Sequence, residues 1–230
     1  MSSGVTYSVV IPFHNEEGSA EELLRKVHDV MSAEKGQFEI IAVNDGSTDS
    51  TAAVIEKSAR SMAAVKIVGN PVRKGQTAAL AAGFLASSGD TVISLDGDMQ
   101  NDPADIPLLL KKMRDAKLDV VCGYRNKRND PAGTRVLSRL GNIFQGVFFG
   151  LAVHDISCTL RVYKGEAARG LLLDKDGLHR FIPFLLKRAG YSVGEAVVSH
   201  RPREHGVSKY SMKKAPATVK LFLKVLLGKI

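Results

Sequence analysis

Short apolar runs alternate with amphipathic segments along the first half of the chain. Apolar runs that end in turn residues are typical of buried strands, and apolar residues spaced three and four apart are typical of helices. We therefore expect strands at residues 7–12, 37–43, 65–69, 91–95 and 119–123, and helices at 19–31, 51–61, 77–86 and 103–116. The first helix should open with a capping box, in which the side chains of Ser19 and Glu22 bond to backbone N–H groups. Strands and helices that alternate with short connections predict an α/β fold, with a mostly parallel sheet and helices on both faces.

The second half of the chain has a looser pattern. We expect a basic loop at 125–134, a helix at 135–150, a strand at 160–163, a helix at 180–189, a strand at 191–198 and a second basic loop at 201–211. Residues 212–230 carry five lysines, with apolar residues at helical spacing, and predict an amphipathic basic helix. The chain then divides into a domain at 1–211 and a C-terminal helix at 212–230, which lies on an anionic membrane or docks on protein.

Composition and charge narrow the classes of partner. The 230 residues are 44% hydrophobic and 24% charged, as in ordinary globular proteins. No apolar run approaches the roughly 20 residues that span a bilayer. The net charge of +8 is uneven, since residues 1–115 carry −5 and residues 116–230 carry +13. The basic half favours a polyanionic partner, which is nucleic acid, a phospholipid surface or a phosphorylated substrate.

Cysteine and histidine usage indicates a cytosolic protein without zinc. Cys122 and Cys158 are isolated and form no C-x-x-C motif, so we expect reduced thiols. The six histidines show no metal-ligand spacing. The polar start of the sequence does not have the pattern of a signal peptide.

The leading candidate for chemistry is the segment 95–103, at the end of the expected strand 91–95. Asp96 and Asp98 stand one residue apart, and Gln100 follows two residues later. Ligands bind at the carboxyl ends of strands in open α/β sheets, and carboxylate and amide oxygens suit Mg²⁺ or Mn²⁺ carrying a phosphorylated ligand. The alternative is an acidic turn in which Asp102 caps the helix that begins at Pro103.

Two common nucleotide-binding motifs are missing from the sequence. The turn after the first strand reads Pro12-Phe13-His14-Asn15-Glu16-Glu17-Gly18-Ser19, without the G-x-G-x-x-G of dinucleotide-binding folds. The chain also contains no G-x-x-x-x-G-K-[ST], the motif of P-loop nucleotidases. The remaining interpretation is a nucleotide-binding fold that holds phosphate through a metal.

Five motifs, in order along the chain, carry a resemblance to a known family. They are VIPFHNE at 10–16, VNDGSTD at 43–49, DGDMQ at 96–100, GYR at 123–125 and HRPREHGVSKY at 200–210. With these motifs the chain resembles a family 2 glycosyltransferase of the GT-A fold, in the polyprenyl-phosphate branch that includes dolichol-phosphate mannose synthase. The resemblance implies that a sugar moves from a nucleoside-diphosphate sugar to a polyprenyl phosphate at the cytoplasmic face of a membrane.

The resemblance also assigns roles to individual residues. It implies that the donor is held by Pro12, His14, Glu16, Val43, Asp45, Asp96, Gly97, Asp98, Arg125, Arg203 and Lys209. The implied ligands of Mg²⁺ or Mn²⁺ are Asp96, Asp98 and Gln100. The implied catalytic set is Asp98, Arg203 and Lys209, together with Arg135 and Ser138, which would hold the acceptor phosphate. A carboxylate such as Asp45 suits a base N–H, because only an acceptor recognises that donor.

Some residues near these motifs favour structural roles. We expect Asp49 to make a turn and cap a helix, and Arg201 to be solvated at the surface. Residues 154–161 lack the Glu-Asp pair of hydroxyl-directed relatives, and we expect the remaining Asp155 to form a salt bridge. A lipid phosphate needs no general base, because its oxygen is ionised near pH 7, with a second pKa of about 6.

The leading hypothesis is an inverting, metal-dependent sugar transferase, and three alternatives stay open. The acceptor could instead be a hydroxyl of a glycan or small molecule. A nucleic-acid-binding module is disfavoured by the absence of Trp and by only 6% aromatic residues. A non-catalytic nucleotide-sugar sensor would bind the donor without turnover. GDP-mannose, UDP-glucose and UDP-GlcNAc all remain candidate donors, since His14 stands where mannose synthases have Tyr, and the oligomeric state is open.

Overall fold

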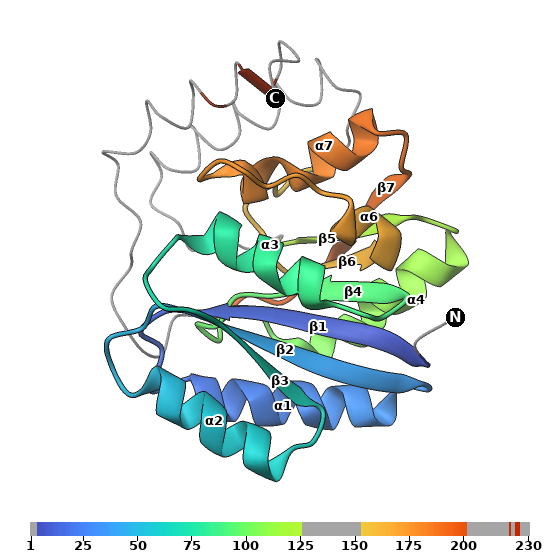
Figure 1. Ribbon diagram of the computed structural model, residues 1–230. Helices are drawn as coiled ribbons and strands as arrows, with labels where there is room; N and C mark the ends of the chain where they lie inside the picture. Colours follow the sequence, from blue (N-terminus) through green and yellow to red (C-terminus); the bar gives the residue numbers. More distant parts are fainter. Residues whose placement is uncertain (1–3, 126–152, 202–220, 222–223, 226–230) are drawn as a thin grey trace.

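A seven-stranded sheet forms the centre of the computed structural model, which describes residues 4–125, 153–201, 221 and 224–225 (Figure 1). The strands are β1 (Val5–Phe13), β2 (Gln37–Asp45), β3 (Val65–Asn70), β4 (Thr91–Ser94), β5 (Val120–Tyr124), β6 (Arg161–Lys164) and β7 (Val193–Val197). Their order across the sheet is β3-β2-β1-β4-β6-β5-β7. Within this sheet β6 runs antiparallel to its two neighbours, and every other described pair is parallel. The prediction of a mostly parallel sheet is confirmed.

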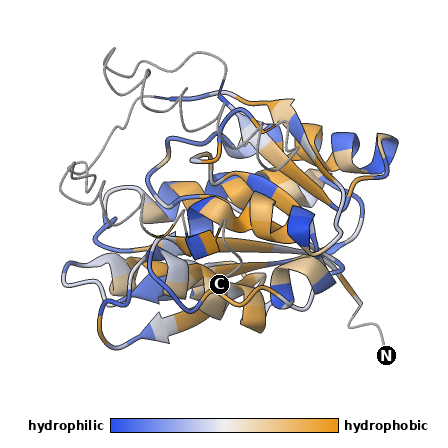
Figure 2. Cartoon of the chain, turned by 90° about the horizontal axis from the view of Figure 1, so that it is seen from above, coloured by the Kyte–Doolittle hydropathy of each residue, from blue (hydrophilic) through white to orange (hydrophobic). Residues whose placement is uncertain are grey.

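Helices cover both faces of the sheet, as the alternating pattern predicted. One face packs against α1 (Ala20–Ala33), α2 (Thr51–Ser61) and α4 (Ile106–Asp115), and the other against α3 (Gln76–Ala86), α6 (Gly165–Arg169) and α7 (Ile182–Arg188). Alternate residues of β1 serve the two cores, because Val9 and Ile11 face α1 while Val10 faces α3. Figure 2 shows the resulting concentration of hydrophobic residues along the strands.

Most expected elements appear within a few residues of their predicted bounds, with three local differences. The helix expected at 103–116 opens with a 3₁₀ turn, η1 (Pro103–Asp105), and the helix expected at 180–189 is preceded by η2 (Leu178–Phe181). The short helix α6 was not expected. The prediction of a capping box at the start of α1 is wrong. The Ser19 hydroxyl donates to the carbonyl oxygen of Gly97 at 2.8 Å, and Glu22 pairs with Lys26.

Several expected elements lie outside the described residues. These are the helix at 135–150, nearly all of both basic loops, and the boundary between a domain at 1–211 and a helix at 212–230. Within the described part of the chain, no helix is long and apolar enough to cross a membrane.

Candidate functional site

The expected donor and metal residues follow three neighbouring parallel strands at the same edge of the sheet. His14 follows β1, Asp45 ends β2, and Asp96 comes two residues after β4. Because β1 runs parallel to both β2 and β4, the carboxyl ends of the three strands meet at this edge. Side chains that are far apart in the sequence are therefore brought to the place where open α/β sheets bind ligands.

The segment after β4 is a tight loop held against β1. A Cβ on Gly97 would lie 2.7 Å from the Phe13 ring and 2.9 Å from the carbonyl oxygen of Pro12, so this position needs glycine. Met99 adopts a left-handed conformation, with φ of 62°, and its side chain is buried. The turn lets the N–H of Gln100 donate to Oδ1 of Asp98 at 3.2 Å. The loop thus holds the Asp98 carboxylate, which is 8% exposed, next to that of Asp96.

Asp96 is the most strongly perturbed carboxylate of this edge. Burial and the negative charge of Asp98 raise the pKa of Asp96 to about 6, although the hydroxyl of Thr159 and the charges of Arg125 and Arg161 oppose the increase. Nε2 of Gln76, at the start of α3, donates to Oδ1 of Asp96 at 2.6 Å. Two carboxylates that repel each other at a strand end fit a divalent cation, because the cation relieves their repulsion.

A cation at this pair needs further oxygen ligands. Among the described residues, no group of three His, Cys, Asp or Glu side chains is placed to hold a metal. Asp96 and Asp98 therefore need oxygens from outside that set, such as the amide of Gln100 or a bound diphosphate. Mg²⁺ sites commonly use one or two carboxylates with substrate phosphates in this way.

The Asp45 carboxylate organises the loop between β3 and α3. Its Oδ1 accepts hydrogen bonds from Nδ2 of Asn70 at 3.1 Å and from the N–H of Lys74 at 2.8 Å, and its Oδ2 accepts the N–H of Gly75 at 2.8 Å. The side chain is 3% exposed. Nδ1 of His14 contacts the carbonyl oxygen of Asp45 at 2.9 Å, so these two expected donor residues lie together.

The other expected donor residues on β1 and β2 have different surroundings. The Val43 side chain is fully buried in the core under α3, where it packs instead of facing the edge. Glu16 is largely buried, and its N–H donates to the hydroxyl of Thr51 at 2.8 Å. Pro12 pairs with Val43 in the register of β1 and β2. Both oxygens of the buried Asp45 already accept hydrogen bonds, so the donor-binding roles of these residues stay predictions.

Two acidic residues serve the structural roles expected of them. Asp49 accepts the N–H of Thr51, the first residue of α2, at 3.0 Å. Asp102 accepts the N–H of Ala104 at 3.1 Å, which caps η1 with Pro103 in its first turn. The helix-capping role expected of Asp102 is confirmed, and the metal role of Asp96 and Asp98 stays a prediction.

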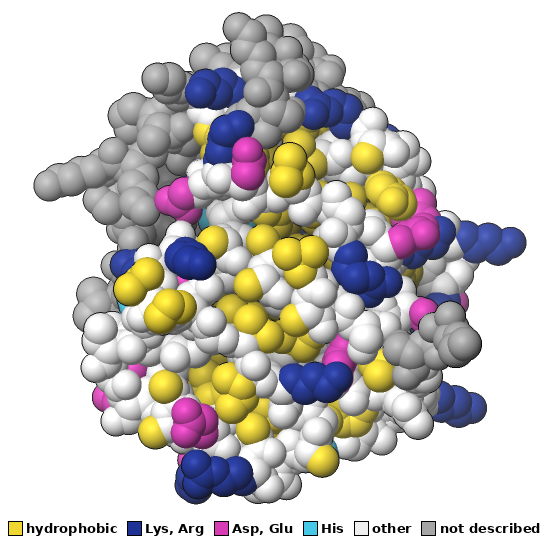
Figure 3. Space-filling view, in the orientation of Figure 1, with side chains coloured by type: hydrophobic (Ala, Val, Ile, Leu, Met, Phe, Trp, Pro, Cys, Tyr) yellow, Lys and Arg dark blue, Asp and Glu magenta, His cyan; other side chains and the backbone are white. Residues whose placement is uncertain are grey.

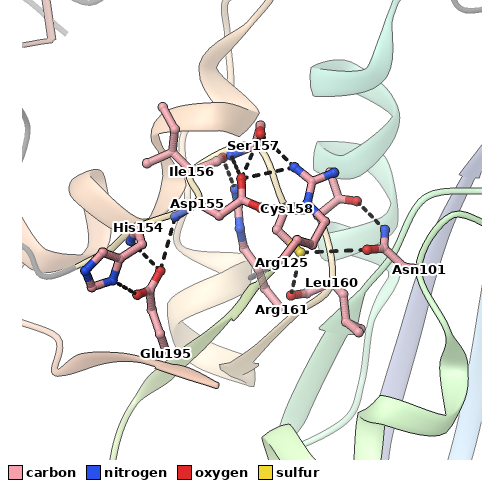
Figure 4. Close-up of polar contacts among 11 residues, drawn as sticks. Asn101, Arg125, His154, Asp155, Ile156, Ser157, Cys158, Leu160, Arg161 and Glu195 are labelled. Atoms are coloured by element: carbon pink, nitrogen blue, oxygen red, sulfur yellow. Dashed lines mark hydrogen bonds and ion pairs between the residues drawn. The ribbon is translucent and has the colours of Figure 1, made fainter. Parts of the chain in front are cut away.

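Arg125 and Asp155 form a nearly buried ion pair beyond β5 (Figure 4). Nε and Nη2 of Arg125 donate to the two Asp155 oxygens at 2.6 and 3.0 Å, and Nη2 also donates to the Ser157 hydroxyl at 2.8 Å. The side chains of Arg125 and Asp155 are 13% and 1% exposed. The salt bridge expected of Asp155 is confirmed, and its partner is the arginine expected to bind diphosphate.

The chain that leads into the second basic loop is attached to the segment expected to bind the metal. The N–H of Arg201 donates to the carbonyl oxygen of Gln100 at 3.0 Å, and the Arg201 side chain forms an ion pair with Asp102. The N–H of Ser199 donates to Asp105 at 2.7 Å. Arg201 is exposed at the surface, as expected, and also pairs with Asp102 there. Arg135, Ser138, Arg203 and Lys209 lie outside the described residues.

Four residues of this region were not singled out from the sequence. Gln76 contacts Asp96, and Nδ1 of the buried His179 lies 2.7 Å from the hydroxyl of Thr77, the next residue of α3. Glu195 of β7 contacts Nδ1 of His154 at 2.7 Å (Figure 4). Arg161 is buried at the start of β6. Each acts through a partner distant in sequence, so no local pattern indicated it.

Comparisons with known proteins agree with this geometry. Residues 8–172 match the model of glycosyl transferase family 2, and the chain therefore belongs to that family. It is 36% identical over 211 residues to dodecaprenyl-phosphate galacturonate synthase of Rhizobium johnstonii, covering 90% of this chain and 62% of the relative. It is 40% identical over 206 residues to undecaprenyl-phosphate 4-deoxy-4-formamido-L-arabinose transferase of Pseudomonas paraeruginosa, covering 89% and 60%. The chain spans about three fifths of the length of these relatives.

Solved structures give the same fold. Glucosyl-3-phosphoglycerate synthase from Mycobacterium tuberculosis, in complex with Mn²⁺, UDP and phosphoglyceric acid, matches with a TM-score of 0.73 at 21% identity, covering 99% of this chain and 79% of that one. Mannosyl-3-phosphoglycerate synthase from Rubrobacter xylanophilus matches with a TM-score of 0.69 at 14% identity, covering 98% and 74%. The expected GT-A fold is confirmed.

Proposed function

We propose that this chain transfers a sugar from a nucleoside-diphosphate sugar to a polyprenyl phosphate. The observation that carries the proposal is the Asp96–Asp98 pair at the carboxyl end of β4, whose repulsion a divalent cation would relieve, and that cation could in turn bind a diphosphate. Both relatives are named for a polyprenyl phosphate, which supports the same acceptor class here.

The donor nucleotide would occupy the edge between β2 and β4. His14, which contacts Asp45, would bind the base or ribose, and Asp96 and Asp98 would face the diphosphate through the cation. Mg²⁺ or Mn²⁺ bound by Asp96, Asp98 and Gln100 would neutralise the charge that develops on the departing nucleoside diphosphate. Arg203 and Lys209 would add positive charge to the same diphosphate, since the anchored Arg201 begins their loop at the metal-binding segment.

The acceptor phosphate oxygen would attack the anomeric carbon in line, with inversion. Asp155 is an unsuitable general base, because both of its oxygens accept hydrogen bonds from Arg125. An acceptor that is already ionised near pH 7 removes the need for a base, and positioning with charge stabilisation then carries the reaction. Arg135 and Ser138 would hold the acceptor phosphate. A long polyprenyl chain would place the protein peripherally on the cytoplasmic face of the membrane. Val225 of the segment 212–230 is fully buried in the core, and its carbonyl oxygen accepts Nη1 of Arg188 at 3.0 Å, which favours docking of this segment on the protein.

The test is a transfer assay with purified full chain. UDP-sugars and GDP-mannose are offered as donors with Mn²⁺, and undecaprenyl phosphate is compared with a glycan acceptor that has only hydroxyl groups. We expect nucleoside diphosphate release with the lipid phosphate alone, and a fall of at least about a hundredfold in Asp98→Asn. Asp115→Asn is the matched control, because Asp115 is an exposed carboxylate on α4. Transfer to the hydroxyl acceptor, or full turnover by Asp98→Asn, would contradict the proposal.

A further inference from the structure

The guanidinium group of Arg161 is buried without a carboxylate partner. Arg161 is 2% exposed, and among the described residues no carboxylate lies within ion-pair distance of it. Nη1 donates to the carbonyl oxygen of His179 at 2.8 Å and Nη2 to that of Ile156 at 2.6 Å, whereas Nε has no hydrogen-bond partner. An arginine stays protonated in such a place, so the protein holds an uncompensated positive charge in its interior.

The neighbouring acidic groups do not neutralise this charge. Burial raises the pKa of the Cys122 thiol to about 12 and that of the Cys158 thiol to about 11, so both thiols are neutral at physiological pH. Burial also raises the pKa of Tyr163, two residues along the same strand. A buried charge of this kind is costly, and its counter-charge has to come from elsewhere.

The charge of Arg161 acts on Asp96, because it is one of the charges that oppose the rise in the pKa of Asp96. Arg161 pairs with Ser94 in the antiparallel ladder, and the same register extended by two residues places Asp96 opposite Thr159. The Thr159 hydroxyl bonds to Asp96, in agreement with this extension. The ladder ends at the pair Ser94–Arg161, and Asp96 follows two residues after Ser94, so Asp96 and Arg161 lie at the same end of β4 and β6.

Arg161 also connects the segments that hold the other site residues. The Ile156 carbonyl belongs to the turn that carries Asp155 and its ion pair with Arg125, as Figure 4 shows. The His179 carbonyl belongs to η2, whose His179 ring contacts Thr77 beside Gln76. The guanidinium group is thus fixed in direction by two carbonyls, under the edge where Asp96 lies.

We propose that Arg161 is a positioning residue that supplies a fixed positive charge beneath Asp96 and favours the diphosphate of the donor over a bare cation. The inference rests on the proposed function, because it takes the Asp96–Asp98 pair as the metal and diphosphate site. Such a charge should change the affinities for a cation and for an anion in opposite directions. A fixed positive charge weakens the binding of a cation alone and strengthens the binding of an anion.

The experiment measures two affinities in the full chain and in Arg161→Met. Mn²⁺ binding without nucleotide is followed by the electron paramagnetic resonance signal of the free ion, and UDP binding at saturating Mn²⁺ is followed by calorimetry. We expect the variant to bind UDP about tenfold more weakly and Mn²⁺ alone as tightly as the wild type or more tightly. A purely structural role would weaken both, and that result, or no change in UDP affinity, would overturn the inference.

A matched control and a second pair of variants keep the test decisive. Arg169 also donates to backbone carbonyls, those of Ser87 and Gly89, but at the amino end of β4, so Arg169→Met should leave both affinities unchanged. If Arg161→Met does not fold, Arg161→Lys and Arg161→Gln replace it, and we expect the charged variant to bind UDP more tightly than the neutral one. Failure of the wild type to bind UDP or GDP with Mn²⁺ would instead contradict the proposed function.

Discussion

Three consecutive residues connect the two carboxylates that define the site. The N–H groups of Lys74 and Gly75 donate to Asp45, and the side chain of Gln76 donates to Asp96. Gln76 is also the first residue of α3, which fixes the position of its backbone. The loop therefore sets the distance between the expected base-binding and diphosphate-binding groups, and its residues position the site without touching the reaction.

Gln76→Ala should reduce donor binding with little loss of stability. A hydrogen bond to a charged group contributes about 1.5–3 kcal/mol, so we expect kcat/KM for the donor to fall by about ten- to a hundredfold. Gln76→Glu should lower kcat/KM further than Gln76→Ala does, because it adds a negative charge beside Asp96. Steady-state kinetics at varied donor concentration measure the effect, and Gln100→Ala provides a comparison within the segment proposed to bind the metal. Unchanged kinetics in Gln76→Glu would exclude a role for this contact.

Glu39 makes the fold sensitive to acid at the opposite end of the strands. The carboxylate is buried, which by itself raises its pKa, but bonds from Lys66, Ser8 and Ser88 lower the pKa from 4.5 to about 2. Because the folded pKa lies below the unfolded one, this stabilisation is present above about pH 4.5 and is lost as the pH falls toward 2.

Glu39→Gln should therefore change both the size and the pH dependence of stability. At pH 7 we expect a loss of about 1–3 kcal/mol in the free energy of unfolding, since the ion pair and charged hydrogen bonds disappear. Between pH 5 and about pH 3 the variant should lose less stability than the wild type. Urea unfolding at a series of pH values measures both effects. Parallel pH profiles for the two proteins would show that Glu39 is not responsible.

At the scale of elements, the local periodicity of apolar residues was sufficient to predict the strands and helices of the parallel half of the sheet. The strands and helices up to residue 124 follow the predicted order, because each buries an apolar face that repeats every two residues or every three to four. The antiparallel direction of β6 was not indicated, since its partners β4 and β5 lie far away in sequence. The sequence around Ser19 is typical of a helix cap. In the folded chain, however, the Ser19 hydroxyl donates to the carbonyl oxygen of Gly97, which is distant in sequence.

The candidate site was predictable to a similar extent. Asp96, Asp98, His14 and Asp45 could be identified because they follow apolar strands in recognisable motifs. Gln76 and Arg161 could not, because nothing in a polar loop or a short strand indicates which distant carboxylate lies nearby. Arg125 was identified as a phosphate-binding residue, but only the structure reveals that Asp155 holds it.

The Arg125–Asp155 pair joins the end of β5 to the turn before β6, and breaking it should affect stability. Arg125→Met or Asp155→Asn alone leaves a buried charge unpaired, so we expect each to cost about 3–5 kcal/mol in unfolding free energy. The double variant should cost less than the sum of the two, which a double-mutant cycle with urea unfolding measures. Lys111 and Asp115, an exposed pair on α4, form the control cycle, with coupling below about 1 kcal/mol.

The same variants test whether Asp155 acts as a base. A catalytic base would make Asp155→Asn lose turnover without losing stability, whereas the ion pair predicts loss of stability in both single variants. An inactive but fully stable Asp155→Asn would contradict the role assigned to the pair.

For the whole molecule, the uneven charge predicts where a membrane would be contacted. The surface in Figure 3 carries Lys and Arg side chains interspersed with Asp, Glu and hydrophobic side chains, without a single basic patch over its described residues. The charge of +13 lies in residues 116–230, and five lysines fall within 212–230. If this segment binds an anionic surface, the binding should depend on those lysines and on ionic strength.

The full chain should sediment with vesicles that contain anionic phospholipid, and not with neutral vesicles. Replacing Lys213, Lys214, Lys220, Lys224 and Lys229 together by Gln should weaken this binding by at least about a hundredfold, since each lysine near an anionic surface contributes about 1 kcal/mol. The matched control replaces Lys57, Lys111 and Lys112 by Gln, since these are exposed lysines of α2 and α4. The control variant should bind anionic vesicles as tightly as the wild type does. Raising the salt concentration should release the wild type and the control variant from the vesicles. Equal binding by the five-lysine variant would mean that the membrane contact comes from another surface.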